Sequence, residues 1–159
     1  MRGIGLVEVL VVVGILGIGL LGIGTLAAQG TRVMAAAADR YEAVLYAREA
    51  VEAIKALRND SWDEYIEPLQ VDTDYYLQQS ASGPLRWELT TIDPGPLYGR
   101  PQNFVRTIRF ERVYRDGNGD PAPVGDEDTH VRRAIIAISW ETRGGVRSIE
   151  SSTYVGDLF

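Results

Sequence analysis

The chain of 159 residues contains no cysteine and a single histidine, His130. Without cysteine, an exported fold must be held together by its core, because disulfides are excluded. A Cys–His nucleophile pair is excluded as well, and no serine stands in a nucleophile-elbow pattern. We therefore expect no enzymatic activity and no catalytic residues. No cofactor is expected either, apart from the calcium considered below.

An excess of positive charge is also missing, since the net charge is −6 and the isoelectric point is near 4.8. This balance argues against a general nucleic-acid surface. Arginines do gather locally, at Arg106, Arg109, Arg112, Arg115, Arg132 and Arg133. Solvated strand faces and pairs with nearby carboxylates explain them more simply than a role in DNA uptake, which stays as an alternative.

The chain does have a long apolar run near its start. No charged residue occurs between Glu8 and Arg32. As a helix, this stretch can cross ~30 Å of hydrocarbon, so we predict a transmembrane or filament-core helix over residues 4–29. The run lacks proline but is rich in glycine, at Gly14, Gly17, Gly19, Gly22 and Gly24. These glycines serve close helix packing, allow local unwinding, or are simply tolerated, as glycine commonly is in membrane helices.

Glu8 is a lone carboxylate in this apolar surrounding. A carboxylate costs ~2.5–3.5 kcal/mol at the bilayer centre and less near its edge. A cost of this kind indicates a functional partner, and the expected partner is a positive charge on another copy of the chain. The competing explanation is that Glu8 reaches the membrane interface or is protonated in lipid.

Gly3, the apolar Ile4, and Glu8 five positions after the glycine resemble the amino terminus of type IV pilins and type II secretion pseudopilins. The resemblance covers roughly residues 2–28. In that family, a prepilin peptidase cuts after the glycine and the new terminal amine is methylated. The resemblance implies a leader over residues 1–3, cleavage between Gly3 and Ile4, and pairing of the Ile4 amine with Glu8 of a neighbouring subunit. The short leader and the missing proline depart from most members.

A secretory signal peptide is the alternative interpretation of the same segment. Signal peptides have a basic start, an apolar core of ~7–15 residues and a small-residue cleavage site. The apolar run here is longer, although the alanines at 27–28 and 35–38 resemble a cleavage site. On this interpretation the chain is a processed secreted protein without an assembly role.

Residues 30–60 predict an amphipathic extension of the same helix. Apolar residues recur at steps of three and four, namely Val33, Ala37, Tyr41, Val44, Ala47, Val51, Ile54 and Leu57. Such spacing gives one apolar stripe, which we expect to pack on a sheet. The turn-forming residues 59–61 predict the end of the helix.

Residues 61–159 predict a globular antiparallel β head. Two-residue alternation and turn signals indicate strands at about 75–79, 85–91, 104–114, 130–140 and 146–154, with a hairpin at Gly144–Gly145. The predicted fold class is therefore α+β. A long helix, with a membrane-spanning inner half and an amphipathic outer half, packs on a small antiparallel sheet, as the resemblance to pilins also implies.

The closing pattern of the chain, from Ile138 to Val155, is similar to minor pilins of the PilV type and to I-type minor pseudopilins. The implied function is that of a structural, minor subunit of a type IV pilus-like or pseudopilus filament. The implied partners are other subunits, the prepilin peptidase and an inner-membrane assembly platform. Arg2 on the short side of the helix predicts a single-pass inner-membrane protein with its head outside, which later enters a periplasmic or extracellular filament.

One loop has the composition of a calcium site. Asp116, Asn118, Asp120 and Glu127 fall at positions one, three, five and twelve of a calcium-loop spacing. Pro121 stands where an EF-hand has glycine, and strands are expected on both sides, so the segment is first of all a turn. The alternative function is a binding module displayed on a membrane or filament, either an adhesin or a calcium-responsive head.

Overall fold

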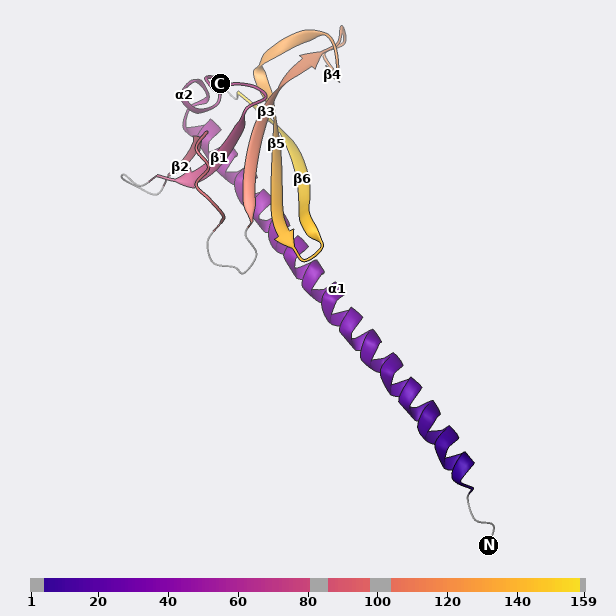
Figure 1. Ribbon diagram of the computed structural model, residues 1–159. Coiled ribbons are helices and arrows are strands. Elements are labelled where there is room, and N and C mark those ends of the chain that lie inside the picture. Colours follow the sequence, from indigo (N-terminus) through magenta and orange to yellow (C-terminus); the bar gives the residue numbers. More distant parts are fainter. Residues whose placement is uncertain (1–4, 81–85, 98–103, 158–159) are drawn as a thin grey trace. The chain divides into compact units, whose positions relative to one another are not determined.

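The structure is a computed structural model that describes residues 5–80, 86–97 and 104–157. Its contacts divide the chain after Arg40 into two units. We call the second the folded unit, which comprises the described residues from Tyr41 to Asp157. Helix α1 (Leu6–Asp60) is continuous across this division (Figure 1). The predicted α+β class is confirmed, because a long N-terminal helix packs on a six-stranded antiparallel sheet, an arrangement consistent with a pilin-like fold.

Helix α1 ends at Asp60, within the turn-forming cluster that predicted its end. Ser61 has an extended backbone, and its side-chain oxygen accepts a hydrogen bond from the Glu64 N–H at 3.2 Å. Ser61 is thus the N-cap of a second, one-turn helix, α2 (Trp62–Tyr65). Helix α2 was not predictable from the sequence, because four residues are too few to show a helical period.

The sheet has the strand order β2-β1-β3-β5-β6, and β4 pairs with β3 outside this path. Its strands are β1 (Asp74–Gln79), β2 (Trp87–Thr90), β3 (Val105–Arg115), β4 (Pro121–Ala122), β5 (Asp126–Thr142) and β6 (Gly145–Gly156). β5 and β6 form the predicted hairpin across Gly144–Gly145, with twelve residue pairs in one register. β6 is an edge strand, since no described strand pairs with its outer side.

A bulge interrupts the pairing of β3 with β5. Arg112 lies opposite Arg132, whereas the next residue, Val113, lies opposite Asp128. The intervening residues of β5, 129–131, therefore have no partner on β3. Bulges of this kind bend a strand and increase its twist. Beyond the bulge, β3 and β5 continue as an arm with β4 at its end, visible at the top of Figure 1.

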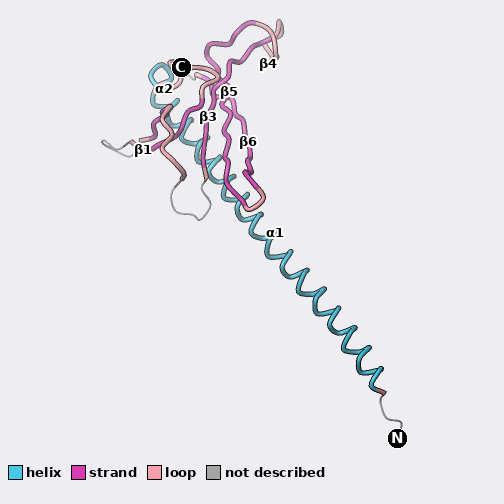
Figure 2. The backbone as a smooth tube through the Cα atoms, in the orientation of Figure 1, coloured by secondary structure: helices cyan, strands magenta, loops and turns pink. Residues whose placement is uncertain are grey.

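The core lies between residues 43–57 of α1 and one face of the sheet (Figure 2). Alternate residues of the two central strands face it: Phe104, Ile108 and Phe110 around β3, and Ala134, Ile136, Ile138 and Trp140 on β5. On the helix, the buried residues are Ala43, Ala47, Ala50, Ala53, Ile54 and Leu57. Small side chains therefore make most of the helix face, which lets the helix approach the sheet closely.

The predicted helix stripe was only partly right. Ala47, Ile54 and Leu57 are buried as expected, but Val33 and Tyr41 are 69% and 66% exposed. The packing face contains Ala43, Ala50 and Ala53 instead. A pattern search weighted toward large apolar residues misses a face built of alanine, because alanine is common on exposed helix surfaces too.

Arg106 is the one charged residue that is buried among the described residues, and it lies on the core face of β3. Its Nη1 is 2.9 Å from Glu49 Oε2 on α1 and 3.4 Å from the Tyr46 carbonyl oxygen. Its guanidinium also lies 5.7 Å from the centre of the Trp87 ring. This arginine therefore links the helix to the sheet from inside the core.

Candidate functional site

Glu8 lies in the first turn of α1, which begins at Leu6. The Glu8 N–H donates to the Gly5 carbonyl oxygen at 2.9 Å, and its side chain is exposed. A carboxylate in the first turn is favoured by the positive end of the helix dipole. The predicted cleavage residues Gly3 and Ile4 lie outside the described residues, so their part in the site stays a prediction.

The apolar side chains around Glu8 are turned outward on every side of the helix. We call residues Leu6–Leu26 the apolar segment. Its valines, leucines and isoleucines are between 51% and 77% exposed. Burying one such side chain stabilises by about 1.5–3 kcal/mol, so leaving this many in water is very unfavourable. Among the described residues, α1 is the one helix long and apolar enough to cross a membrane, and its apolar stretch is not buried within the chain.

The glycines of the apolar segment have no packing reason among the described residues. A Cβ added at Gly14, Gly17, Gly19, Gly22 or Gly24 would meet nothing within 4 Å. The helix nevertheless continues through them, and Thr25 Oγ1 donates to the Gly22 carbonyl oxygen at 2.8 Å. The structure therefore leaves close packing against another helix, local unwinding and simple tolerance all open as interpretations.

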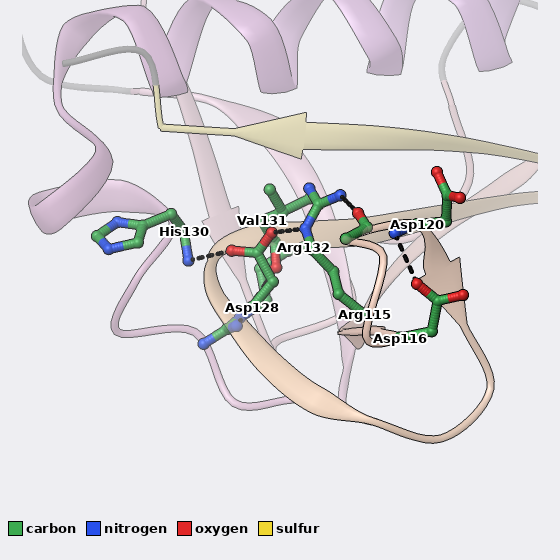
Figure 3. Close-up of polar contacts among 8 residues, drawn as sticks. Arg115, Asp116, Asp120, Asp128, His130, Val131 and Arg132 are labelled. Atoms are coloured by element: carbon green, nitrogen blue, oxygen red, sulfur yellow. Dashed lines mark hydrogen bonds and ion pairs between the residues drawn. The ribbon is translucent and has the colours of Figure 1, made fainter.

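The loop proposed for calcium is arranged as a hydrogen-bonded turn (Figure 3). Asp116 Oδ1 accepts from the backbone N–H of Asn118 and of Asp120, at 2.9 and 3.0 Å. The Asp116 N–H in turn donates to the Asp120 carbonyl oxygen at 2.9 Å. One Asp116 oxygen is thus engaged in closing the turn, as Asp commonly does in such loops.

Glu127, the fourth predicted calcium ligand, lies on β5 between two arginines. Its oxygens are 3.5 Å from Arg112 Nη1 and 3.6 Å from Arg132 Nη1. The structure does not bring Asp116, Asn118, Asp120 and Glu127 together, and the described residues contain no group of three or more His, Cys, Asp or Glu placed to hold a metal ion. Calcium binding stays a prediction that calcium titration of the protein tests.

Asp128 is the most strongly paired carboxylate of the arm, and the sequence pattern did not single it out as a candidate site residue. Its Oδ2 is 2.6 Å from Arg115 Nε, and its Oδ1 accepts from the His130 N–H at 3.1 Å (Figure 3). The hydrogen bond from Arg115 lowers the pKa of Asp128, against the burial that raises it, and the bond from the His130 N–H lowers it further. Asp128 thus joins β3 to β5 just beyond the bulge.

This pairing predicts an acid-dependent contribution to stability. The pKa of Asp128 is lower in the folded than in the unfolded chain, so its contribution is complete above the unfolded value of about 4 and is lost as pH falls through the lower folded value. Asp128→Asn should therefore destabilise the folded unit at neutral pH, and this destabilisation should disappear in acid. Urea unfolding followed by tryptophan fluorescence measures it, because Trp62, Trp87 and Trp140 all lie in the folded unit.

Asp126→Asn is the matched control, since Asp126 is an exposed carboxylate on the same strand. It should change stability little at either pH. The free energy of unfolding of Asp128→Asn should differ from that of the unaltered chain at about pH 7 and approach it at about pH 3. A difference that stays constant over this range would contradict the lowered pKa of Asp128, because titration of that carboxyl is what removes the difference.

The arginines of β3 are explained by ion pairs within the folded unit. Arg109 pairs with Asp74 on β1 at 2.7 Å, and Arg133 on β5 contacts Glu111 at 3.3 Å. With the pairs of Arg106, Arg112 and Arg115, each arginine of this strand has a carboxylate partner. This compensation leaves no unopposed basic stripe on β3. The buried Arg106 was missed, although its place two residues from both Phe104 and Ile108 put it on the apolar face.

No protein-family model, curated protein or solved structure matches this chain.

Proposed function

We propose that this chain is a minor structural subunit of a type IV pilus-like or type II secretion pseudopilus filament. The observation that carries the proposal is the apolar segment, whose side chains are exposed all around the helix and among which Glu8 is the one charge. The resemblance of residues 2–28 to prepilin amino termini supports it. Both features concern the same end of the chain.

The apolar segment requires an apolar environment, and two can supply it. Before assembly, the segment spans the inner membrane as a single helix, long enough for ~30 Å of hydrocarbon. After assembly, it lies among the same segments of neighbouring subunits in the filament core. Because lipid and packed helices are both apolar, transfer between them costs little for valine, leucine and isoleucine.

Glu8 distinguishes the two environments. Once the leader of residues 1–3 is removed by the prepilin peptidase, Ile4 carries a positive α-amine, and an unpaired charge is strongly disfavoured in an apolar surrounding. A neighbouring subunit displaced along the filament brings its amine to Glu8, and each charge then compensates the other. Assembly on the inner-membrane platform therefore favours one axial register between subunits.

The folded unit is built onto the same helix. Residues 43–57 of α1 form one wall of its core, and Arg106 fixes that wall to β3. A subunit drawn from the membrane by its helix therefore brings its folded unit with it, since α1 runs from Leu6 to Asp60 and its last part belongs to that unit. In the proposed filament, the folded unit lies outside the membrane, on a periplasmic or extracellular surface.

Processing at Gly3 tests the proposal. Mass spectrometry of protein from the native host should show a mature chain that begins with methylated Ile4. Gly3→Val should leave an unprocessed precursor, because the peptidase of this family requires the small residue before the cut. Gly5→Ala, a glycine change on the other side of the cut, should be processed normally. A mature chain that begins elsewhere, or normal processing of Gly3→Val, would overturn the proposal.

A further inference from the structure

A cavity of about 520 Å³ opens on the folded unit, away from the core. Its floor is a row of three side chains on adjacent strands: Glu111 on β3 lies opposite Arg133 on β5, which lies opposite Tyr154 on β6. Each of them follows or precedes a buried core residue, so by alternation all three point away from α1. The volume falls within the range of about 300–1,000 Å³ typical of ligand sites.

The wall of the cavity is the short strand β4 with the residue that follows it, Pro123. β4 is held against β3 by the pairs Tyr114–Ala122 and Arg115–Pro121. Gly125 allows the chain to return closely past β3, because a Cβ there would lie 2.0 Å from the Arg115 carbonyl oxygen. Two prolines and this close return make the wall a fixed feature of the arm.

The cavity contains both signs of charge, and neither sign is fully satisfied by the protein. Arg133 makes one contact with a carboxylate, 3.3 Å from Glu111, although a guanidinium has five N–H donors. Its side chain is 42% exposed. The carboxylates of Asp72 and Glu111 line the same cavity. A ligand must therefore offer acceptors to Arg133 and donors to the two carboxylates.

These requirements select one class of ligand. A simple anion such as phosphate satisfies Arg133 but is repelled by the two carboxylates. A neutral sugar gives hydroxyl donors to the carboxylates but leaves Arg133 without an anion. A sugar acid carries both groups, and the exposed ring of Tyr154, with Tyr114 and the prolines, offers a flat apolar surface for the sugar ring.

We propose that this cavity binds an acidic saccharide. The sugar carboxylate is held by Arg133, sugar hydroxyls donate to Asp72 and Glu111, and the ring packs on Tyr154. The proposal rests on the folded unit alone, so it does not depend on whether the chain assembles into a filament.

The test uses the full chain in detergent micelles and isothermal titration calorimetry. The probe is a trimer of galacturonic acid, and the neutral galactose trimer, inorganic phosphate and an acidic peptide, triglutamate, are the comparison ligands. We expect binding of the galacturonate trimer only. Arg133→Gln should weaken it by about tenfold or more, because it removes a charge-assisted contact. Arg109→Gln, an arginine on β3 that does not line the cavity, should bind normally.

Absence of heat change with the galacturonate trimer at about 10 mM would overturn the proposal, since binding weaker than that is below about 3 kcal/mol. Equal binding of the neutral trimer, phosphate or triglutamate would overturn the assigned ligand class. If Arg109→Gln weakened binding of the galacturonate trimer as much as Arg133→Gln, the binding would reflect the overall charge of the protein and not a site in the cavity.

Discussion

Glu8→Val is expected to insert into the membrane as well as the unaltered chain and to be nearly absent from filaments. Valine removes a carboxylate that lipid disfavours, so insertion cannot suffer. In the proposed filament, however, the Ile4 amine of the adjoining subunit would lose its partner. Uncompensated charge of this kind costs ~2.5–3.5 kcal/mol, which corresponds to a loss of incorporation by about 100-fold. Quantitative immunoblotting of membrane and sheared-filament fractions measures both quantities.

Two further variants separate charge from size at this position. Glu8→Gln keeps the shape of the side chain and should fail like Glu8→Val. Val9→Leu changes the neighbouring apolar residue and should assemble normally, since its side chain stays apolar. Wild-type incorporation of Glu8→Gln would exclude the ion pair as the basis of assembly, whatever Glu8→Val does.

The stability of the folded unit should respond very differently to loss of Glu49 and to loss of Arg106, which form an ion pair. Arg106 is 4% exposed and Glu49 is 44% exposed. Glu49→Ala leaves a guanidinium in the core without its anion and should destabilise the folded unit by about 1–3 kcal/mol, below the full cost of breaking a buried pair because water reaches Glu49. Arg106→Met replaces the charge by an apolar side chain of similar length and should cost less than about 1 kcal/mol.

Denaturant unfolding of both single variants and of the double variant gives the comparison as a double-mutant cycle. The double variant should resemble Arg106→Met, since Glu49 without Arg106 is merely a half-exposed carboxylate. Glu52→Ala is the control on the same helix, where the exposed pair with Lys55 should contribute less than about 1 kcal/mol. An Arg106→Met variant less stable than Glu49→Ala would show that Arg106 acts chiefly through its contacts with Tyr46 and Trp87.

The sequence predicted those elements whose signals are local. Alternation around Phe104–Phe110 and the glycine pair at 144–145 located β3, β5 and β6 to within a few residues, and the cluster at 59–61 located the end of α1. The long helix was predictable because an uncharged run of this length has few other stable conformations.

Pairing between distant segments was not predictable in this way. No local pattern places β1 next to β3, since that contact joins residues more than thirty positions apart, such as Asp74 and Arg109. The bulge opposite Arg112 and the β4 arm depend on such pairing too, and so does the cavity above them. The spacing of Asp116, Asn118, Asp120 and Glu127 is likewise a sequence pattern alone, and calcium binding by them stays a prediction.

The outer edge of β6, with which no described strand pairs, has a practical consequence. Its twelve residues run without a bulge and without proline, and Arg147 and Glu150 are its only charges. Natural edge strands are usually short, bent or rich in charge, since an open row of main-chain groups is a template for aggregation. Isolated preparations of this protein at high concentration should therefore tend toward edge-to-edge association, and a lysine placed at Ser148 or Ser152 would be the first change to make for solubility.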